Sequence, residues 1–224
     1  MENMKKLLFL DTETTGLTSK HGVIQIASYI DAVNNIDDID CIKKFDFTCN
    51  VYPQDEISEE ALQKTGTTRE EIANYKNPSR VFNDFNAIVQ GHRSFKNNLT
   101  LIGYNTRFDY DMMGAWYDKG SPLNSRNNPQ FKFFHLIGSD WIDVQTLIVD
   151  LFIWNKIKLD NIKLETLAPY FKISHKAHDA YSDIEVTREI FYRIKRMQLK
   201  NLPFSSMMIP FDFRKAELEC IELN

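Results

Sequence analysis

A short apolar run that leads directly into two acidic residues constrains the fold of this chain more than any other feature. Residues 7–10 are apolar at every position, and Asp11 and Glu13 follow at once. Because side chains on a β-strand alternate between its two faces, a strand here places Leu7, Phe9, Asp11 and Glu13 on one face. Two close carboxylates repel each other, and partial burial increases that cost. A bound divalent cation would relieve the repulsion, although acids at an exposed strand end are equally ordinary.

The remaining hydrophobic patterns predict an α/β fold in which strands come first and helices follow around a further strand. A polar turn near Asn34 and Asn35 separates two of the strands. Ser58 is a suitable N-cap for the first helix, and Gly66 ends it. Strands are expected over residues 7–10, 23–33, 45–52 and 99–104, and further helices over residues 78–89, 108–117, 143–154, 164–171 and 179–199.

A third acidic residue, Asp183, stands at the start of the longest predicted helix. With helical spacing it heads a stripe formed by Thr187, Ile190, Ile194 and Met197, which otherwise faces the core. An uncompensated charge on that side costs several kcal/mol, so a partner is expected. Stabilisation by the helix dipole is the alternative, and it explains an acid near the helix start but not its place on the apolar side.

The segment from Asn105 to Asp109 follows an apolar strand and opens a helix. In an α/β sheet, ligands collect at strand ends, so Asp109 is the acid expected to face Asp11. Asp111 is a competitor that points elsewhere if both residues are helical. Asn105 commonly orders such a turn by bonding to the backbone.

His178 lies five residues before Asp183, away from the apolar stripe of that helix. An unperturbed imidazole has a pKa of about 6.5, so it can take a proton at neutral pH. A lone histidine is more often structural or solvated, so His178 is a candidate general base only in combination with the acids.

Together the three clusters resemble the DEDDh exonucleases, the DnaQ-like group that includes polymerase proofreading subunits and RNase T. Residues 11–17 resemble the family motif DxETTGL, residues 105–109 resemble NxxFD, and residues 178–183 resemble HxAxxD. Order and separation also match, and the resemblance covers about residues 5–198.

The resemblance implies a ribonuclease H-like fold, a five-stranded mixed sheet flanked by helices on both faces, with the fifth strand near residues 141–143. It also implies two divalent cations, Mg²⁺ with Mn²⁺ as a substitute, held by Asp11, Glu13, Asp109 and Asp183. Asp11 is expected to bridge both cations, and His178 to be the general base for the attacking water.

The same resemblance implies four substrate contacts. The backbone of Thr14 is expected to contact the terminal 3′ hydroxyl, and Leu17 to wedge between the last two bases. Asn105 is included because it belongs to the second motif. Phe108 is expected to line or stack on the terminal nucleotide, with a core aromatic as the equal alternative.

These features predict a 3′→5′ exonuclease that releases nucleoside monophosphates from single-stranded DNA ends. One rival is an exoribonuclease that acts on RNA 3′ ends or short oligoribonucleotides, because the motifs are shared. The other is a non-enzymatic nucleic-acid module, which would be expected to lack at least one of the acids or the histidine. A polymerase or replication partner stays open, since no polymerase-binding motif is recognised.

Composition and charge narrow the class of protein and its expected location. The net charge of −4 argues against an electrostatic grip on long duplex DNA. Three cysteines without metal-binding spacing, a leading apolar run too short for a signal peptide and the lack of a membrane-spanning stretch favour a cytoplasmic protein. We expect an exonuclease domain over residues 1–200, with an insertion near 121–140, and a C-terminal extension over 201–224. Either addition forms a rim or docking surface, or is simply solvated.

Overall fold

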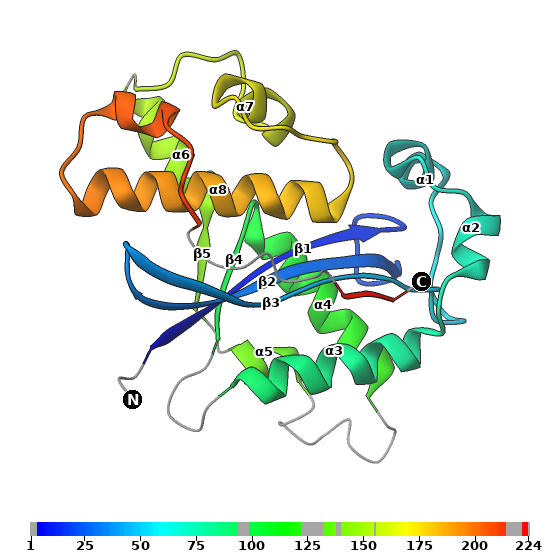
Figure 1. Ribbon diagram of the computed structural model, residues 1–224. Helices are drawn as coiled ribbons and strands as arrows, with labels where there is room; N and C mark the ends of the chain where they lie inside the picture. Colours follow the sequence, from blue (N-terminus) through cyan, green and yellow to red (C-terminus); the bar gives the residue numbers. More distant parts are fainter. Residues whose placement is uncertain are drawn as a thin grey trace.

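A six-stranded mixed sheet forms the centre of the computed structural model, with helices on both faces (Figure 1). The structure describes residues 4–93, 99–121, 132–137, 140–154, 156–213 and, for the backbone alone, 221–223. The strand order is β5-β4-β1-β2-β3-β6. The strands are β1 (Lys5–Thr14), β2 (Val23–Asn35), β3 (Asp38–Thr48), β4 (Thr100–Gly103), β5 (Trp141–Asp143) and β6 (Ile221–Leu223).

Strand β1 lies at the centre because two kinds of pairing meet on it. It pairs antiparallel with β2, which continues into β3 through a tight hairpin. On its other side it pairs parallel with β4, which pairs parallel with β5. The ends of β1, β4 and β5 therefore lie at one edge of the sheet, where α/β folds collect ligands.

Helices α3 (Pro78–His92), α4 (Thr106–Gly120) and α5 (Phe133–Ile137) cover one face of the sheet (Figure 1). Their core is rich in aromatic side chains. Phe85 contacts Trp116 and Tyr117 edge to face, with ring centroids 6.1 Å apart in both pairs. Such pairs add specific geometry to the burial of apolar area, so this layer fixes the position of α4.

Helices α6 (Val144–Ile153), α7 (Leu164–Tyr170) and α8 (Ala180–Leu199) cover the opposite face. The buried side of α8 includes Ile184, Ile190 and Ile194, which pack with Phe9 of β1. A short 3-10 helix, η3 (Phe204–Met208), follows α8, and Phe211 beyond it stacks on Tyr192 with centroids 5.0 Å apart.

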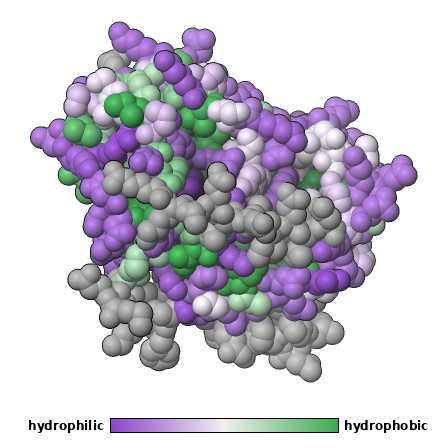
Figure 2. Space-filling view, in the orientation of Figure 1, coloured by the Kyte–Doolittle hydropathy of each residue, from purple (hydrophilic) through white to green (hydrophobic). Residues whose placement is uncertain are grey.

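Two short helices, α1 (Glu59–Thr65) and α2 (Arg69–Asn74), lie beside the sheet at the end where β1 finishes (Figure 1). Ser58 caps α1 as predicted, and Gly66 ends it in the left-handed conformation that favours glycine. The face seen in Figure 2 is mostly hydrophilic, with small patches of exposed apolar side chains. No helix among the described residues is long and apolar enough to cross a membrane.

The five-stranded sheet with two helical layers is confirmed, including the fifth strand at Trp141–Asp143. Strand β3 starts at Asp38, seven residues before the predicted start, because polar side chains there still pair with the long β2. Within the expected insertion, residues 122–131 and 138–139 lie outside the described part. Phe133 between them belongs to a short helix, α5, within the expected insertion, and it is buried because its ring packs on Tyr117.

The tail also differs from the expectation. Beyond the predicted sheet, β6 adds a sixth strand that pairs parallel with β3. A three-residue edge strand has no local sequence pattern, since its partner supplies the hydrogen bonds. The division into a domain of residues 1–200 and an extension of 201–224 stays a prediction.

Candidate active site

Strand β1 carries Asp11 and Glu13 to the face of the sheet that α8 covers. Phe9, two residues before Asp11, packs in the core beneath α8, and alternation along the strand places both acids on the same side. Neither acid is at a frayed end, since Asp11 is paired opposite Ala27 and Glu13 opposite Gln25. This is the face that the alternation predicted.

Helix α8 supplies a third carboxylate from its first turn. Asp183 heads a stripe that continues through the fully buried Thr187 and Ile190, as the helical spacing predicted. Asp183, Asp11 and Glu13 each place a carboxylate oxygen within 4.8 Å of the other two. The dipole of α8 favours an acid in this turn, but it does not remove the repulsion among three carboxylates.

Helix α4 supplies the fourth carboxylate, Asp109, which is only 3% exposed. One of its oxygens accepts hydrogen bonds from the Thr12 hydroxyl at 2.8 Å and the Thr12 backbone N–H at 3.0 Å. Asp111 instead forms an exposed ion pair with Arg107, with Nε and Oδ2 2.7 Å apart. The structure thus turns Asp109 toward β1 and Asp111 toward solvent, as expected.

Burial raises the pKa of all four acids, and repulsion from the other acids of the cluster adds to this rise at Asp11 and Glu13. Burial, then the charges of Asp183 and Asp109, raises the pKa of Glu13 to about 7. Burial raises the pKa of Asp109 to about 7 against the opposing hydrogen bonds from Thr12. Burial and the other three acids hold the pKa of Asp11 well above its usual range, and burial also raises that of Asp183. The cluster therefore needs positive charge to be fully ionised at neutral pH.

A divalent cation fits this donor set. All the converging groups are carboxylates, the ligands that hard cations such as Mg²⁺ and Mn²⁺ prefer. The three-acid group of Asp11, Glu13 and Asp183 is close enough for its oxygens to share one ion. Asp109 is held close by, on the other side of β1's end, by its bonds to Thr12.

The acids open into a pocket of about 430 Å³. Its walls come from the end of β1, the β1–β2 loop, helix α1, the start of α4 and the segment before α8. The lining residues are Asp11, Thr12, Glu13, Thr14, Gly16, Leu17, Thr18, His21, Ser58, Glu60, Ala61, Lys64, Thr65, Tyr104, Phe108, Asp109, His178 and Asp183.

Three of the four predicted substrate contacts line this pocket. Thr14 is buried and donates its hydroxyl to the Gly16 carbonyl, at 2.7 Å. Leu17 is 79% exposed, a state that a core leucine does not adopt. Phe108 is half-buried, and it both lines the pocket and packs against the core cluster.

Asn105 is the exception, because among the described residues it does not line the pocket. It adopts the left-handed conformation, with φ of 58°, at the start of α4. Its backbone N–H donates to the Asp143 carboxylate at 3.0 Å, which joins the ends of β4 and β5. The structure thus places Asn105 in the turn that orients Phe108 and Asp109.

Two histidines precede α8, and only one was singled out in the sequence. His178 lines the pocket and has a left-handed backbone, with φ of 61°. His175 was missed, yet its Nε2 hydrogen-bonds the Asp183 carboxylate and its side chain is 7% exposed. No periodic pattern marks His175, since it lies in a loop. The sequence did offer one signal for it, namely a second histidine three residues before the motif at residues 178–183.

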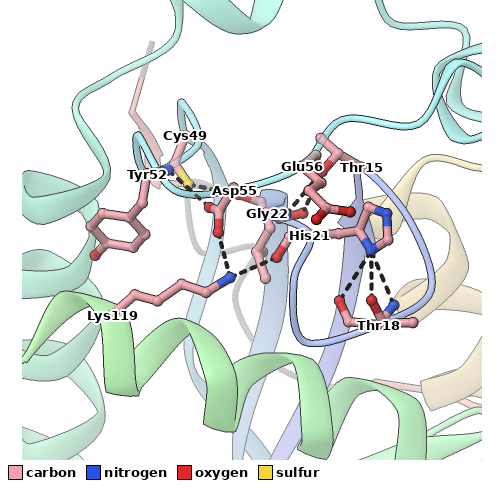
Figure 3. Close-up of polar contacts among 10 residues, drawn as sticks. Thr15, Thr18, His21, Gly22, Cys49, Tyr52, Asp55, Glu56 and Lys119 are labelled. Atoms are coloured by element: carbon pink, nitrogen blue, oxygen red, sulfur yellow. Dashed lines mark hydrogen bonds and ion pairs between the residues drawn. The ribbon is translucent and has the colours of Figure 1, made fainter.

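An ion pair and hydrogen bonds hold the β1–β2 loop, which forms one wall of the pocket, against neighbouring segments (Figure 3). From α4, Lys119 reaches the Asp55 carboxylate and donates to the His21 carbonyl at 2.9 Å. Thr15 donates its hydroxyl to the Glu56 carbonyl at 2.6 Å. The imidazole of His21 lies over Gly16, where a Cβ would meet it at 2.1 Å, so a larger residue would require the imidazole to move.

The family comparison matches most of the chain. The RNase_T exonuclease family model covers residues 8–191, which includes every predicted site residue. A relative, the PolC-type DNA polymerase III of Thermotoga petrophila, is 25% identical over 197 residues. That alignment covers 85% of this chain but 12% of the polymerase.

Solved structures of exonuclease I share the fold. E. coli exonuclease I in complex with a dT13 oligonucleotide superposes with a TM-score of 0.66 at 18% identity, covering 88% of this chain and 43% of that one. The zinc-bound E. coli exonuclease I complex with single-stranded DNA gives 0.64 at 18% identity, over 88% and 41%. The chain thus spans less than half the length of these enzymes.

Three results agree: the family match over residues 8–191, the similarity to PolC and the sheet shared with exonuclease I. The acidic cluster also suits the divalent metal use that the family implies. The chain therefore belongs to the DEDDh, or DnaQ-like, 3′→5′ exonucleases of the ribonuclease H-like superfamily.

Proposed function

We propose that this chain hydrolyses single-stranded DNA from its 3′ end and releases nucleoside monophosphates. The observation that carries the proposal is the convergence of Asp11, Glu13, Asp109 and Asp183 on one pocket, with His178 in the same lining. Four close acids with raised pKa values destabilise a fold unless a ligand neutralises them. Such clusters are typical of functional sites.

The acids are proposed to hold two divalent cations, Mg²⁺ with Mn²⁺ as a substitute. When bound, such ions lower the pKa of water and neutralise charge on the scissile phosphate. Asp11, Glu13 and Asp183 offer oxygens within 4.8 Å of one another for this purpose. Thr12 occupies one oxygen of Asp109 and leaves the other available.

His178 is proposed to take the proton from the attacking water. A general base must reach the pocket and have a nitrogen that can accept a proton, and the imidazole of His178 lies in the lining. Its left-handed backbone is a conformation that non-glycine residues adopt mainly at constrained sites. The turn therefore directs the imidazole into the pocket.

Leu17, Phe108 and Thr14 are proposed to hold the terminal nucleotides. An exposed leucine and a half-buried phenylalanine on the same pocket offer apolar surfaces against which bases can stack. Asn105 is proposed to order the α4 turn rather than to touch substrate, in line with its place outside the lining.

DNA is preferred as the substrate because two kinds of relative handle DNA. The similar exonuclease I structures contain DNA oligonucleotides, and the similar polymerase is a DNA polymerase. RNA 3′ ends or short oligoribonucleotides are the alternative, since both nucleic acids offer the same phosphates. The PolC relationship also supports a polymerase or replication partner.

Digestion of matched single strands tests the proposal. Strands labelled at the 5′ or the 3′ end, as DNA and as RNA, are incubated with Mg²⁺ or with EDTA. With Mg²⁺ we expect the 3′ label to be released at once as a mononucleotide. The 5′-labelled strand should give a ladder of shortened products, and neither strand should be cleaved in EDTA. Much faster cleavage of RNA would overturn the DNA preference, and release from the 5′ end would overturn the direction.

A matched pair of variants tests the site. Asp11→Asn should reduce cleavage by several orders of magnitude, because it removes a charge from the cluster. Asp111→Asn alters an exposed acid two residues from Asp109 and should leave the rate within about twofold, as surface changes usually do. Equal activity of both variants would contradict the site assignment.

A further inference from the structure

A buried histidine outside the family motif contacts one of the four acids. The Nε2 of His175 hydrogen-bonds Oδ1 of Asp183, and the two side chains are 7% and 16% exposed. Among the described residues His175 does not line the pocket, whereas Asp183 does. His175 therefore meets the site only through the carboxylate of Asp183.

The backbone around His175 is built to keep this contact. His178, which has a left-handed backbone, lies between His175 and the first turn of α8, and His175 contacts Asp183 in that turn. The backbone N–H of Lys176 donates to the Ser182 hydroxyl at 2.8 Å. The Lys176 ammonium also pairs with Asp179 at 3.0 Å. The segment that carries His175 is therefore held to the start of α8 by contacts of its own.

The hydrogen bond engages one oxygen of the Asp183 carboxylate. An ionised carboxylate only accepts hydrogen bonds, so the imidazole presents its Nε2–H to Oδ1. The hydrogen bond thereby restrains the rotamer of Asp183, whose carboxylate is one of the three that lie close enough together to share a cation. Residues that orient metal ligands in this way typically change metal affinity by about 10–100-fold when they are lost.

We propose that His175 is a positioning residue that holds Asp183 in its metal-binding orientation, while His178 faces the substrate. This inference rests on the proposed metal-dependent function. It assigns different tasks to two histidines three residues apart: loss of His175 weakens cation binding, and loss of His178 slows hydrolysis without weakening cation binding.

Direct binding of Mn²⁺ to the full chain, by calorimetry or electron paramagnetic resonance and without substrate, tests the proposal. His175→Phe keeps ring volume but removes the donor, and His175→Asn is too short to reach Asp183. His175→Gln places an amide N–H near the position of Nε2. We expect a 10–100-fold loss of Mn²⁺ affinity for Phe and Asn, recovery of most of it for Gln, and unchanged affinity for His178→Asn.

Thermal unfolding in EDTA accompanies each measurement, and any variant that is not folded is replaced by the other donor-free variant. Wild-type Mn²⁺ affinity in His175→Phe or His175→Asn would overturn the proposal. So would an equal loss in His175→Gln, since the ring rather than the donor would then matter. If the wild type bound no Mn²⁺, the metal site of the proposed function would fail together with this inference. A binding wild type with unaffected His175 variants refutes the inference alone.

Discussion

Thr12 and Asp109 join the central strand to helix α4 through two hydrogen bonds to a single carboxylate oxygen, at 2.8 and 3.0 Å. Both donors favour the ionised acid and therefore oppose the burial that raises the pKa of Asp109 to about 7. The pair is buried, with Thr12 6% and Asp109 3% exposed. A residue that carries no charge thus controls the ionisation of one that does.

Thr12→Val should shift the acid limb of the pH–rate profile upward. Valine has the shape of threonine without the hydroxyl donor, so the pKa of Asp109 rises further and its carboxylate forms only at higher pH. We expect kcat/KM near pH 7 to fall by about tenfold, the equivalent of one net hydrogen bond of about 1.4 kcal/mol. Thr12→Ser, which keeps the donor, should retain the wild-type profile. Superimposable profiles for the valine variant would contradict this role.

The metal-free protein should become less stable as pH rises. The pKa of Glu13 and of Asp109 is about 7 in the folded chain, above the ordinary 4.5 and 3.8. Folding therefore binds protons between these values, and the associated stability, complete below about pH 4, is lost as pH rises through about 7. In EDTA we expect the melting temperature to be several degrees higher at pH 6 than at pH 8.

Two additions isolate this effect from other titrations. Mg²⁺ should restore the melting temperature at pH 8 more than at pH 6, because the ion competes with protons for the same oxygens. Glu13→Gln in EDTA should flatten the profile, since the amide does not titrate. Parallel profiles for Glu13→Gln and the wild type would show that the acids do not govern this dependence.

Much of the site could be predicted because its acids lie on regular elements. Asp11 and Glu13 follow the alternation of β1, and Asp183 follows the helical stripe through Thr187 and Ile190. On such elements residue spacing determines direction. The faces of these three acids were therefore predicted without tertiary information, whereas Asp109 depended more on the family motif.

What could not be predicted depends on loops and on distant pairs. His175 contacts Asp183 across a loop in which His178 has a left-handed backbone, and sequence spacing does not encode that turn. Lys119 and Asp55 are 64 residues apart and meet only once α4 has packed on the sheet.

Lys119→Met should destabilise the fold and loosen the β1–β2 loop that forms one wall of the pocket. The Lys119 and Asp55 side chains are 15% and 1% exposed, so the variant leaves a buried carboxylate without its partner. Breaking such a pair costs about 3 kcal/mol, roughly a 6–12 °C lower melting temperature for a domain of this size. The His21 carbonyl loses its donor as well, so KM should rise.

Lys20→Met, in an exposed pair with Glu56 at 4.0 Å, is the matched control and should leave both quantities unchanged. The double variant Lys119→Met with Asp55→Leu should recover part of the stability, since no buried charge remains. A single variant as stable as the wild type would mean that the buried pair contributes nothing.

Lys64 of α1 should determine the salt dependence of substrate binding. It is the only lysine or arginine among the described residues that line the pocket, and its charge opposes the raised pKa of Glu13. A lysine that contacts a phosphate of a single strand adds about 0.7 to the slope of log affinity against log salt concentration. Lys64→Met should therefore weaken binding of an oligonucleotide and lower that slope by about 0.7.

Binding is measured with a non-hydrolysed strand in Ca²⁺. Lys200→Met, at the opposite end of α8 beside Asp37, should keep the wild-type slope. An unchanged slope for Lys64→Met would show that this lysine does not meet the phosphate backbone.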